Sequence, residues 1–179
     1  MDYIEHFFCL PASPNYVVQV NQGFGLDQNW QAYKYGFSDA TGGYWLGNEN
    51  MYQMTNNGHQ WNVCAEAVDT SGIVYQVSYS KFIVDSESDG YTYFASGMSG
   101  SPSDMLGPDS RKNKFTSKDV NNQIGTCANQ AVASKGGWWW ACSNSDKIIL
   151  NGVGSTGFKF PLYGFSIPLK SCVIRISQP

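Results

Sequence analysis

Charged residues are scarce in this sequence. Asp, Glu, Lys and Arg make up only 14% of its 179 residues, whereas an average soluble domain has about 25%. The densest basic run, at residues 111–114, contains three cations, which is too few to neutralise many phosphates. We therefore expect that no nucleic acid is the main partner.

Long apolar runs are also missing. No stretch approaches the roughly 20 residues that a membrane-spanning helix needs, so we expect no transmembrane segment. The N-terminus lacks the basic start and the long apolar centre of a signal peptide. A fragment, a partial gene model or a start inside a longer protein would each explain this absence.

Histidine occurs only at His6 and His59. His6 lies near the N-terminus, and His59 follows a turn-forming run at residues 56–58. Around neither histidine can a nucleophile, a base and an orienting acid be assembled. The acidic run at residues 85–89 indicates a solvated turn rather than a metal loop. We expect that the protein is not an enzyme.

Cysteine is present, but no two cysteines form a C-x-x-C pair. This absence argues against a zinc site and against a thioredoxin-like site. The five positions, Cys9, Cys64, Cys127, Cys142 and Cys172, are widely and irregularly spaced, which indicates disulfides formed in an oxidising compartment. We therefore expect a secreted, extracellular protein in which the odd count leaves one thiol without an internal partner.

Glycine and aromatic residues are abundant, with 19 glycines and 15% aromatics, which favours short strands joined by many turns. Period-two alternation at residues 61–67 and 73–79 predicts an antiparallel hairpin. Shorter strands are predicted at residues 16–20, 81–84, 91–95 and 171–177. We expect the last of these to pair with the sheet of the hairpin.

Two short helices are predicted between the strands. Asp27 is a candidate N-cap for a helix over residues 30–34, and Asn48 is a candidate N-cap for a second helix. Residues 97–171 show little periodicity and predict a loop-rich subdomain, where recognition sites commonly lie.

The fold class predicted from these patterns is α+β. We expect one domain over residues 1–179, in which an antiparallel sheet has short flanking helices and a C-terminal, ligand-binding subdomain at residues 97–171. The N-terminal segment, residues 1–15, has no defined pattern.

Three successive tryptophans, Trp138, Trp139 and Trp140, are the most unusual local feature. In an extended segment, neighbouring side chains point to opposite sides. We expect one or two of these rings to lie in the core and at least one to face a ligand pocket. The alternative, in which all three are structural, has equal weight.

Two groups of motifs resemble the fibrinogen C-terminal domain family, which includes ficolins, tachylectins, angiopoietins and fibrinogen. The first group is WQAYKYGF at residues 30–37 and GYWLGNEN at residues 43–50. The second is FTSKD at residues 115–119, Cys127, GWW at residues 137–139, Cys142 and LNG at residues 150–152. The resemblance covers nearly the whole chain and implies the fold of that family and a recognition function.

The resemblance also implies a disulfide, because the family has cysteines where Cys127 and Cys142 stand. A second bridge, between Cys64 and Cys172, is predicted because relatives place the terminal strand beside the hairpin. That pairing is specific to this chain and would leave Cys9 alone.

By the same resemblance, we expect the ligand pocket to lie between the segment from Cys127 to Ser143 and the loop from Phe158 to Phe165. The expected ligand-binding residues are Trp138, Trp139, Trp140, Cys142, Ser143, Phe158 and Tyr163. The family usually has histidine where this chain has Ser143, a departure that bears on the recognition of acetyl groups.

The family's calcium loop corresponds to residues 119–125. The candidate ligands are Asp119, Asn121 and the backbone carbonyls of Gln123 and Gly125. Calcium prefers six to eight oxygens that include several carboxylates, and only Asp119 supplies one here. We expect a weak calcium site, and a polar turn without a metal is an alternative of equal weight.

The sequence therefore predicts an extracellular, lectin-like module of innate immunity that binds glycans or acetylated groups. The alternative, from another class, is a protein-binding module in cell adhesion, receptor signalling or matrix assembly. In both cases we expect an oligomer in the full-length context.

Overall fold

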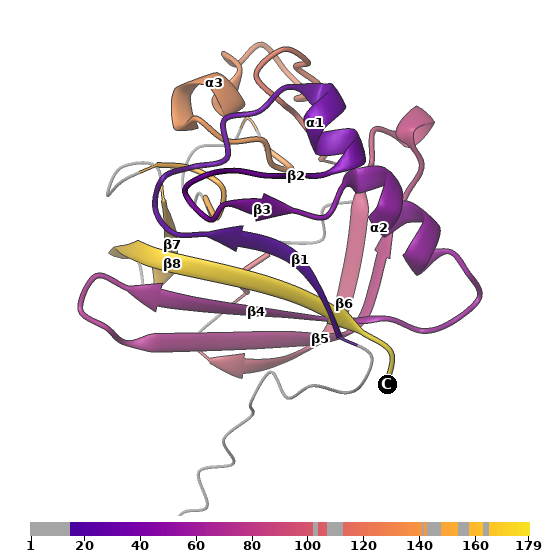
Figure 1. The fold of residues 1–179 in the computed structure, drawn as a ribbon, viewed down its shortest axis with the longest axis horizontal. Helices are drawn as coiled ribbons and strands as arrows, with labels where there is room; N and C mark the ends of the chain where they lie inside the picture. The colour runs from indigo at the N-terminus through magenta and orange to yellow at the C-terminus, as the bar shows by residue number, and fades with distance from the viewer. Residues whose placement is uncertain are drawn as a thin grey trace, which may run out of the picture.

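One antiparallel sheet organises the chain. The computed structural model describes residues 15–101, 104–106, 113–140, 142, 148–153, 158–162 and 165–179. The strands follow the order β2-β3-β1-β8-β4-β5-β6, and β7 pairs separately with β8. Their bounds are β1 Asn15–Asn21, β2 Phe37–Ser38, β3 Tyr44–Trp45, β4 Asn62–Asp69, β5 Val74–Val84, β6 Tyr93–Ser101, β7 Lys159–Leu162 and β8 Phe165–Ser177. This arrangement confirms the predicted fold class (Figure 1).

The central strands form where the sequence alternates between apolar and polar residues. β4 pairs with β5 as the predicted hairpin, and β8 pairs with β4 on the other side. Cys172, Ile174 and Ile176 of β8 are buried, as expected for one face of a strand with a period of two. The predicted hairpin and the predicted terminal strand are therefore confirmed.

The strands predicted at residues 81–84 and 91–95 are parts of longer strands. β5 continues without interruption to Val84, and β6 runs on to Ser101. Opposite Ser80, the strand β6 has Gly97 with a φ of +69°, and a Cβ atom there would clash with the Ser80 hydroxyl. Only glycine tolerates both the backbone angle and this approach, so Gly97 lets the two strands stay paired along their length.

Short helices lie beside the sheet: α1 Trp30–Tyr35, α2 Asn48–Thr55, the 3₁₀ turn η1 Glu87–Asp89 and α3 Gln130–Ser134. The predicted caps are wrong by one or two residues. The N-cap of α1 is Asn29, whose side chain accepts a hydrogen bond from the N–H of Ala32, rather than Asp27. Asn48 is the first residue of α2, and its buried side chain accepts a hydrogen bond from Trp45.

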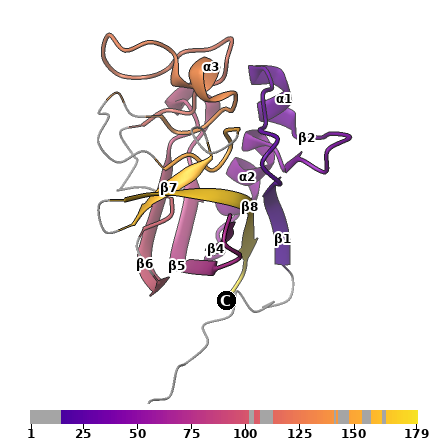
Figure 2. The ribbon, with the colours of Figure 1, turned by 90° about the vertical axis from the view of Figure 1, so that its left-hand side faces the viewer.

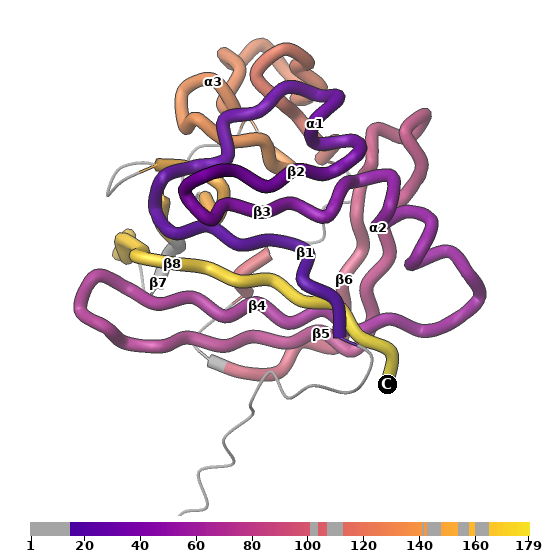
Figure 3. The backbone as a smooth tube through the Cα atoms, viewed as in Figure 1, coloured from indigo at the N-terminus to yellow at the C-terminus, as the bar shows by residue number. Residues whose placement is uncertain are grey.

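The helices α1 and α3 lie together at one end of the molecule, although about a hundred residues separate them in the sequence (Figures 1 and 2). The tube in Figure 3 shows the indigo segment with α1 beside the orange segment with α3, while the turn between β4 and β5 lies away from both. Residues from both halves of the sequence therefore build this end of the molecule.

Aromatic rings fill the core between the sheet and this end. Tyr33 of α1 contacts the rings of Trp45 and Phe115, and Trp45 contacts Trp138 and Trp139. All five side chains are buried. Within the part of the chain that the structure describes, no helix is long and apolar enough to cross a membrane.

Candidate functional site

The hydroxyl of Tyr33 connects α1 to residues 136–140, which we call the tryptophan segment. It accepts a hydrogen bond of 2.8 Å from the N–H of Gly137 and donates one to the carbonyl of Leu26. Tyr33 is fully buried, and burial raises the pKa of its phenol above the ordinary value, so the hydroxyl stays protonated and can donate. The start of the tryptophan segment is thus hydrogen-bonded to a buried side chain of α1.

Asn151, in the LNG motif, continues this network. The side-chain amide of Asn151 donates to the carbonyl of Gly137 at 2.7 Å. The backbone carbonyl of Asn151 accepts from the N–H of Leu26 at 3.0 Å. A Cβ atom on Gly136 would clash with the backbone of Asn151. The side chain of Gln19 in β1 donates to the carbonyl of Leu150 at 2.9 Å. Buried polar groups therefore join the sheet to the segments that were expected to carry the ligand pocket.

The three tryptophans all lie in the core, with 2%, 7% and 3% of Trp138, Trp139 and Trp140 exposed. The indole of Trp139 donates to the carbonyl of Tyr91, and that of Trp140 donates to the carbonyl of Gly136. None of the three rings is exposed, and Trp138 and Trp139 line a small apolar cavity in the core together with Trp45 and Ile174. Trp140 turns back onto its own segment, where Gly136 accepts its N–H. The expected role of these rings in ligand binding stays a prediction.

The other expected pocket residues are only partly described. Phe158 is completely buried, so its ring is a core residue rather than a contact surface. Cys142 is half-buried. Ser143 and Tyr163 lie outside the described residues, and their expected roles stay predictions.

The disulfide between Cys127 and Cys142 is confirmed, with 5.6 Å between the two Cα atoms. The bridge predicted between Cys64 and Cys172 is wrong, because Cys172 is a free, buried thiol and Cys64 is disulfide-bonded. In the pairing of β4 with β8, Cys172 lies opposite Ala67 and Cys64 lies opposite Arg175. Cys64 is three positions from Ala67, the residue opposite Cys172, and residues an odd number of positions apart in a strand face opposite sides of the sheet. The two sulfurs therefore lie on opposite sides, which prevents the bridge. Cys9 lies outside the described residues.

One side-chain oxygen of Asp119 and the side-chain oxygen of Asn121 accept hydrogen bonds within the protein. Oδ1 of Asp119 accepts from the N–H of Trp30 at 2.8 Å and from the hydroxyl of Ser117 at 2.7 Å. Oδ1 of Asn121 accepts from the N–H of Gln123 at 3.2 Å. Among the described residues, no three His, Cys, Asp or Glu side chains are grouped as metal ligands would be. Calcium prefers several carboxylates among its oxygen ligands, and of the expected ligands only Asp119 supplies one, while Gln123 and Gly125 would supply carbonyls. The weak calcium site and the polar turn without a metal both stay predictions.

Two exposed apolar side chains lie close to the disulfide in the sequence. Ile124 is 67% exposed and Val132, in α3, is 57% exposed. Gln123 links their two segments, since its side chain donates to the sulfur of Cys127 at 3.3 Å and accepts from the N–H of Gln130 at 2.8 Å. We refer to Ile124, Val132 and the disulfide beside them as the disulfide surface.

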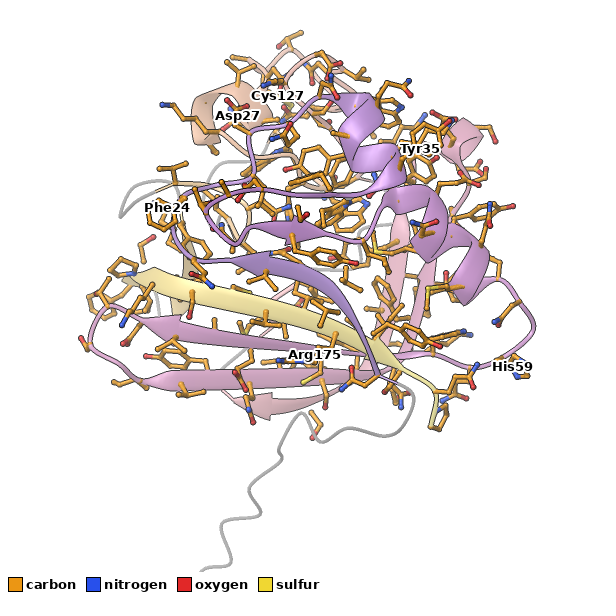
Figure 4. The ribbon with its side chains drawn as sticks, viewed as in Figure 1. Phe24, Asp27, Tyr35, His59, Cys127 and Arg175 are labelled. Carbon is orange, nitrogen blue, oxygen red and sulfur yellow. A yellow bond between two sulfur atoms is a disulfide. The ribbon has the colours of Figure 1, made fainter. Side chains whose placement is uncertain are left out.

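The disulfide surface was not predicted from the sequence. Ile124 could have drawn attention, because it is a single apolar residue in a run of Asn, Gln and Gly with no periodic partner. Figure 4 places Cys127 at the end of the molecule that also carries Asp27, and places His59 far away at the other end. The one described histidine is therefore remote from this surface.

Comparison with known proteins gives a consistent result. The family model for the C-terminal globular domain of fibrinogen beta and gamma chains matches residues 17–158. Angiopoietin-1 of Sus scrofa is 31% identical over 140 residues, which cover 76% of this chain and 27% of that protein. The chain therefore spans about a quarter of this relative's length.

Solved structures agree with the sequence matches. The fibrinogen-like globe domain of human ANGPTL6 has a TM-score of 0.75 at 26% identity, covering 91% of this chain and 77% of that one. The lamprey fibrin D-dimer, solved with the peptide Gly-His-Arg-Pro-amide, has a TM-score of 0.70 at 19% identity, covering 89% of this chain and 60% of that one. The second likeness concerns the fold alone.

Proposed function

We propose that this chain, which belongs to the family of fibrinogen C-terminal globular domains, binds an extracellular protein through its disulfide surface. Members of this family are non-enzymatic binding domains and are typically extracellular. The observation that carries the proposal is the exposure of Ile124 and Val132, which belong to the two segments that Gln123 joins. Adhesion, receptor signalling and matrix assembly are the settings that such a domain would serve.

The disulfide surface has the properties of the centre of a protein interface. Such centres are depleted in charge and enriched in apolar contact area. Held in place by the Cys127–Cys142 bridge and by Gln123, the two segments are ordered before a partner arrives. Preorganisation of this kind reduces the entropy cost of binding.

A glycan or an acetylated ligand has less support. Recognition of sugars commonly uses an exposed aromatic face, because an indole offers a flat apolar surface. Trp138, Trp139 and Trp140 are buried, and the exposed rings among the described residues, such as Phe24 and Tyr35, belong to other segments.

The test compares two arrays that are probed with the same purified domain. One array carries glycans, including acetylated sugars, and the other carries the ectodomains of cell-surface and matrix proteins. We expect binding to one or more ectodomains and no binding to glycans. Binding to acetylated sugars alone would overturn the proposal in favour of a lectin.

We also propose that the domain acts outside the cell as one module of a longer, oligomeric protein. The Cys127–Cys142 disulfide requires an oxidising compartment to persist. The matched relative is about four times longer than the matched region. Light scattering of the full-length secreted protein would give its oligomeric state, and a monomer would contradict this part of the proposal.

A further inference from the structure

We propose that Asp119 is a clamp that joins the loop at residues 117–125 to the N-terminus of α1, and that this subdomain keeps its form without calcium. The proposal concerns what orders the loop, so it does not depend on which partner the domain binds. It starts from the contacts of the one carboxylate in the loop.

Oδ1 of Asp119 receives a hydrogen bond from the first N–H of α1. The donor is Trp30, 89 positions earlier in the chain, and the distance between the two atoms is 2.8 Å. The first N–H groups of a helix have no partner within the helix, and a carboxylate at this end is favoured by the helix dipole. The side chain of the N-cap Asn29 accepts a hydrogen bond from the N–H of Ala32. Asp119 therefore accepts from a helix N–H, that of Trp30, to which Asn29 is not bonded.

The neighbouring residue binds the same segment of chain. Nζ of Lys118 donates to the carbonyl of Asp27 at 2.9 Å and lies 3.5 Å from its carboxylate. The loop therefore holds the residues before α1 at two adjacent points. Lys118 is the residue directly before Asp119, and a cation near a carboxylate opposes the binding of a second cation there.

Side-chain amides hold the rest of the loop. Asn129, the N-cap of α3, donates to the carbonyl of Ser117 at 2.8 Å, and Asn122 donates to the carbonyl of Phe115 at 2.9 Å. Gln123 ties the end of the loop to Gln130 and to Cys127. Hydrogen bonds within the protein thus join this loop to α1, to α3 and to the disulfide, so that contacts other than a metal ion hold it in place.

The test uses two substitutions of one residue. Asp119→Asn removes the charge that calcium needs but keeps an oxygen that can accept from Trp30 and Ser117. Asp119→Ala removes both. Thermal unfolding of wild type and of each variant is followed in excess calcium and in excess chelator, with Asn121→Ala as a matched control in the same loop.

We expect the wild-type midpoint to be the same in calcium and in chelator. Asp119→Ala should lower it by about 2–4 °C, the effect of losing a helix-terminal acceptor in a domain of this size, while Asp119→Asn and Asn121→Ala should stay close to wild type. A wild-type midpoint that rises with calcium, or an Asp119→Asn variant as destabilised as Asp119→Ala, would overturn the proposal. Unchanged stability in Asp119→Ala would overturn it as well.

Discussion

The backbone N–H of Gly137 donates a 2.8 Å hydrogen bond to the hydroxyl of Tyr33, which lies 104 positions earlier in the chain. The same hydroxyl donates to the carbonyl of Leu26. One buried oxygen therefore joins α1, the segment before it and the start of the tryptophan segment. This oxygen is therefore one of the buried points at which the C-terminal subdomain is attached to the rest of the domain.

Replacement of Tyr33 by Phe should be costly although the ring is kept. It leaves the N–H of Gly137 and the carbonyl of Leu26 buried without this partner, which costs roughly 1–3 kcal/mol of unfolding free energy. Denaturant unfolding measures the loss. Tyr35→Phe is the matched control, because Tyr35 is 62% exposed, and it should change stability by less than about 0.5 kcal/mol. Equal stability of Tyr33→Phe and wild type would show that the hydrogen bonds of the Tyr33 hydroxyl do not stabilise the fold.

Truncation of Trp140 should unfold the domain rather than empty a binding site. The ring is 3% exposed, so Trp140→Ala should cost about 3–5 kcal/mol, as a large buried ring does. Trp45→Ala should cost a similar amount, since Trp45 is 1% exposed. Phe24→Ala, at a ring that is 65% exposed, is the control with little expected effect. A Trp140→Ala variant with the unfolding free energy of wild type would mean that this ring is a surface residue.

The free thiol of Cys172 should make stability fall at alkaline pH. Burial raises the pKa of this thiol above its ordinary value of 9.0, so the unfolded chain loses the proton before the native chain does. The stability from the protonated, buried thiol is therefore complete below pH 9 and is lost as the pH rises above it.

Comparison of wild type with Cys172→Ala isolates this contribution, because the buried tyrosines titrate in both proteins. Between about pH 8 and about pH 10.5, wild type should lose about 2 kcal/mol more unfolding free energy than Cys172→Ala. The same loss in both proteins would mean that the thiol ionises equally in the native and the unfolded chain. Native Cys172 should also resist thiol reagents until the domain unfolds.

The sequence predicts the parts of this fold that depend on local pattern. The alternation of Ile174 and Ile176 in β8 is read directly from a period of two, and the approximate positions of α1 and α2 follow from turn residues and caps. The family motifs also predicted the Cys127–Cys142 bridge. In each case the information lies within a few residues or in a shared motif.

The parts that could not be predicted depend on contacts between distant segments. Alternation suggested that one of the three tryptophans faces outwards. Instead, the indole N–H of Trp139 donates a hydrogen bond to the carbonyl of Tyr91, which lies 48 positions earlier in the chain. The role of Asp119 depends on Trp30 in the same way. The predicted bridge between Cys64 and Cys172 was wrong because the register of the two strands places the cysteines on opposite sides of the sheet. Knowing that two strands are adjacent does not give their register.

The most direct test of the central claim is the affinity of the domain for the ectodomain that the array identifies, measured with two double variants. Ile124→Ser with Val132→Ser removes the apolar side chains of the disulfide surface, and Ile73→Ser with Val74→Ser removes two similarly exposed ones at the turn between β4 and β5. We predict that the first pair weakens binding at least about tenfold, as loss of central interface residues does, while the second pair leaves it unchanged. Unchanged affinity in the first pair, with the fold intact, would contradict the account and place the binding site elsewhere.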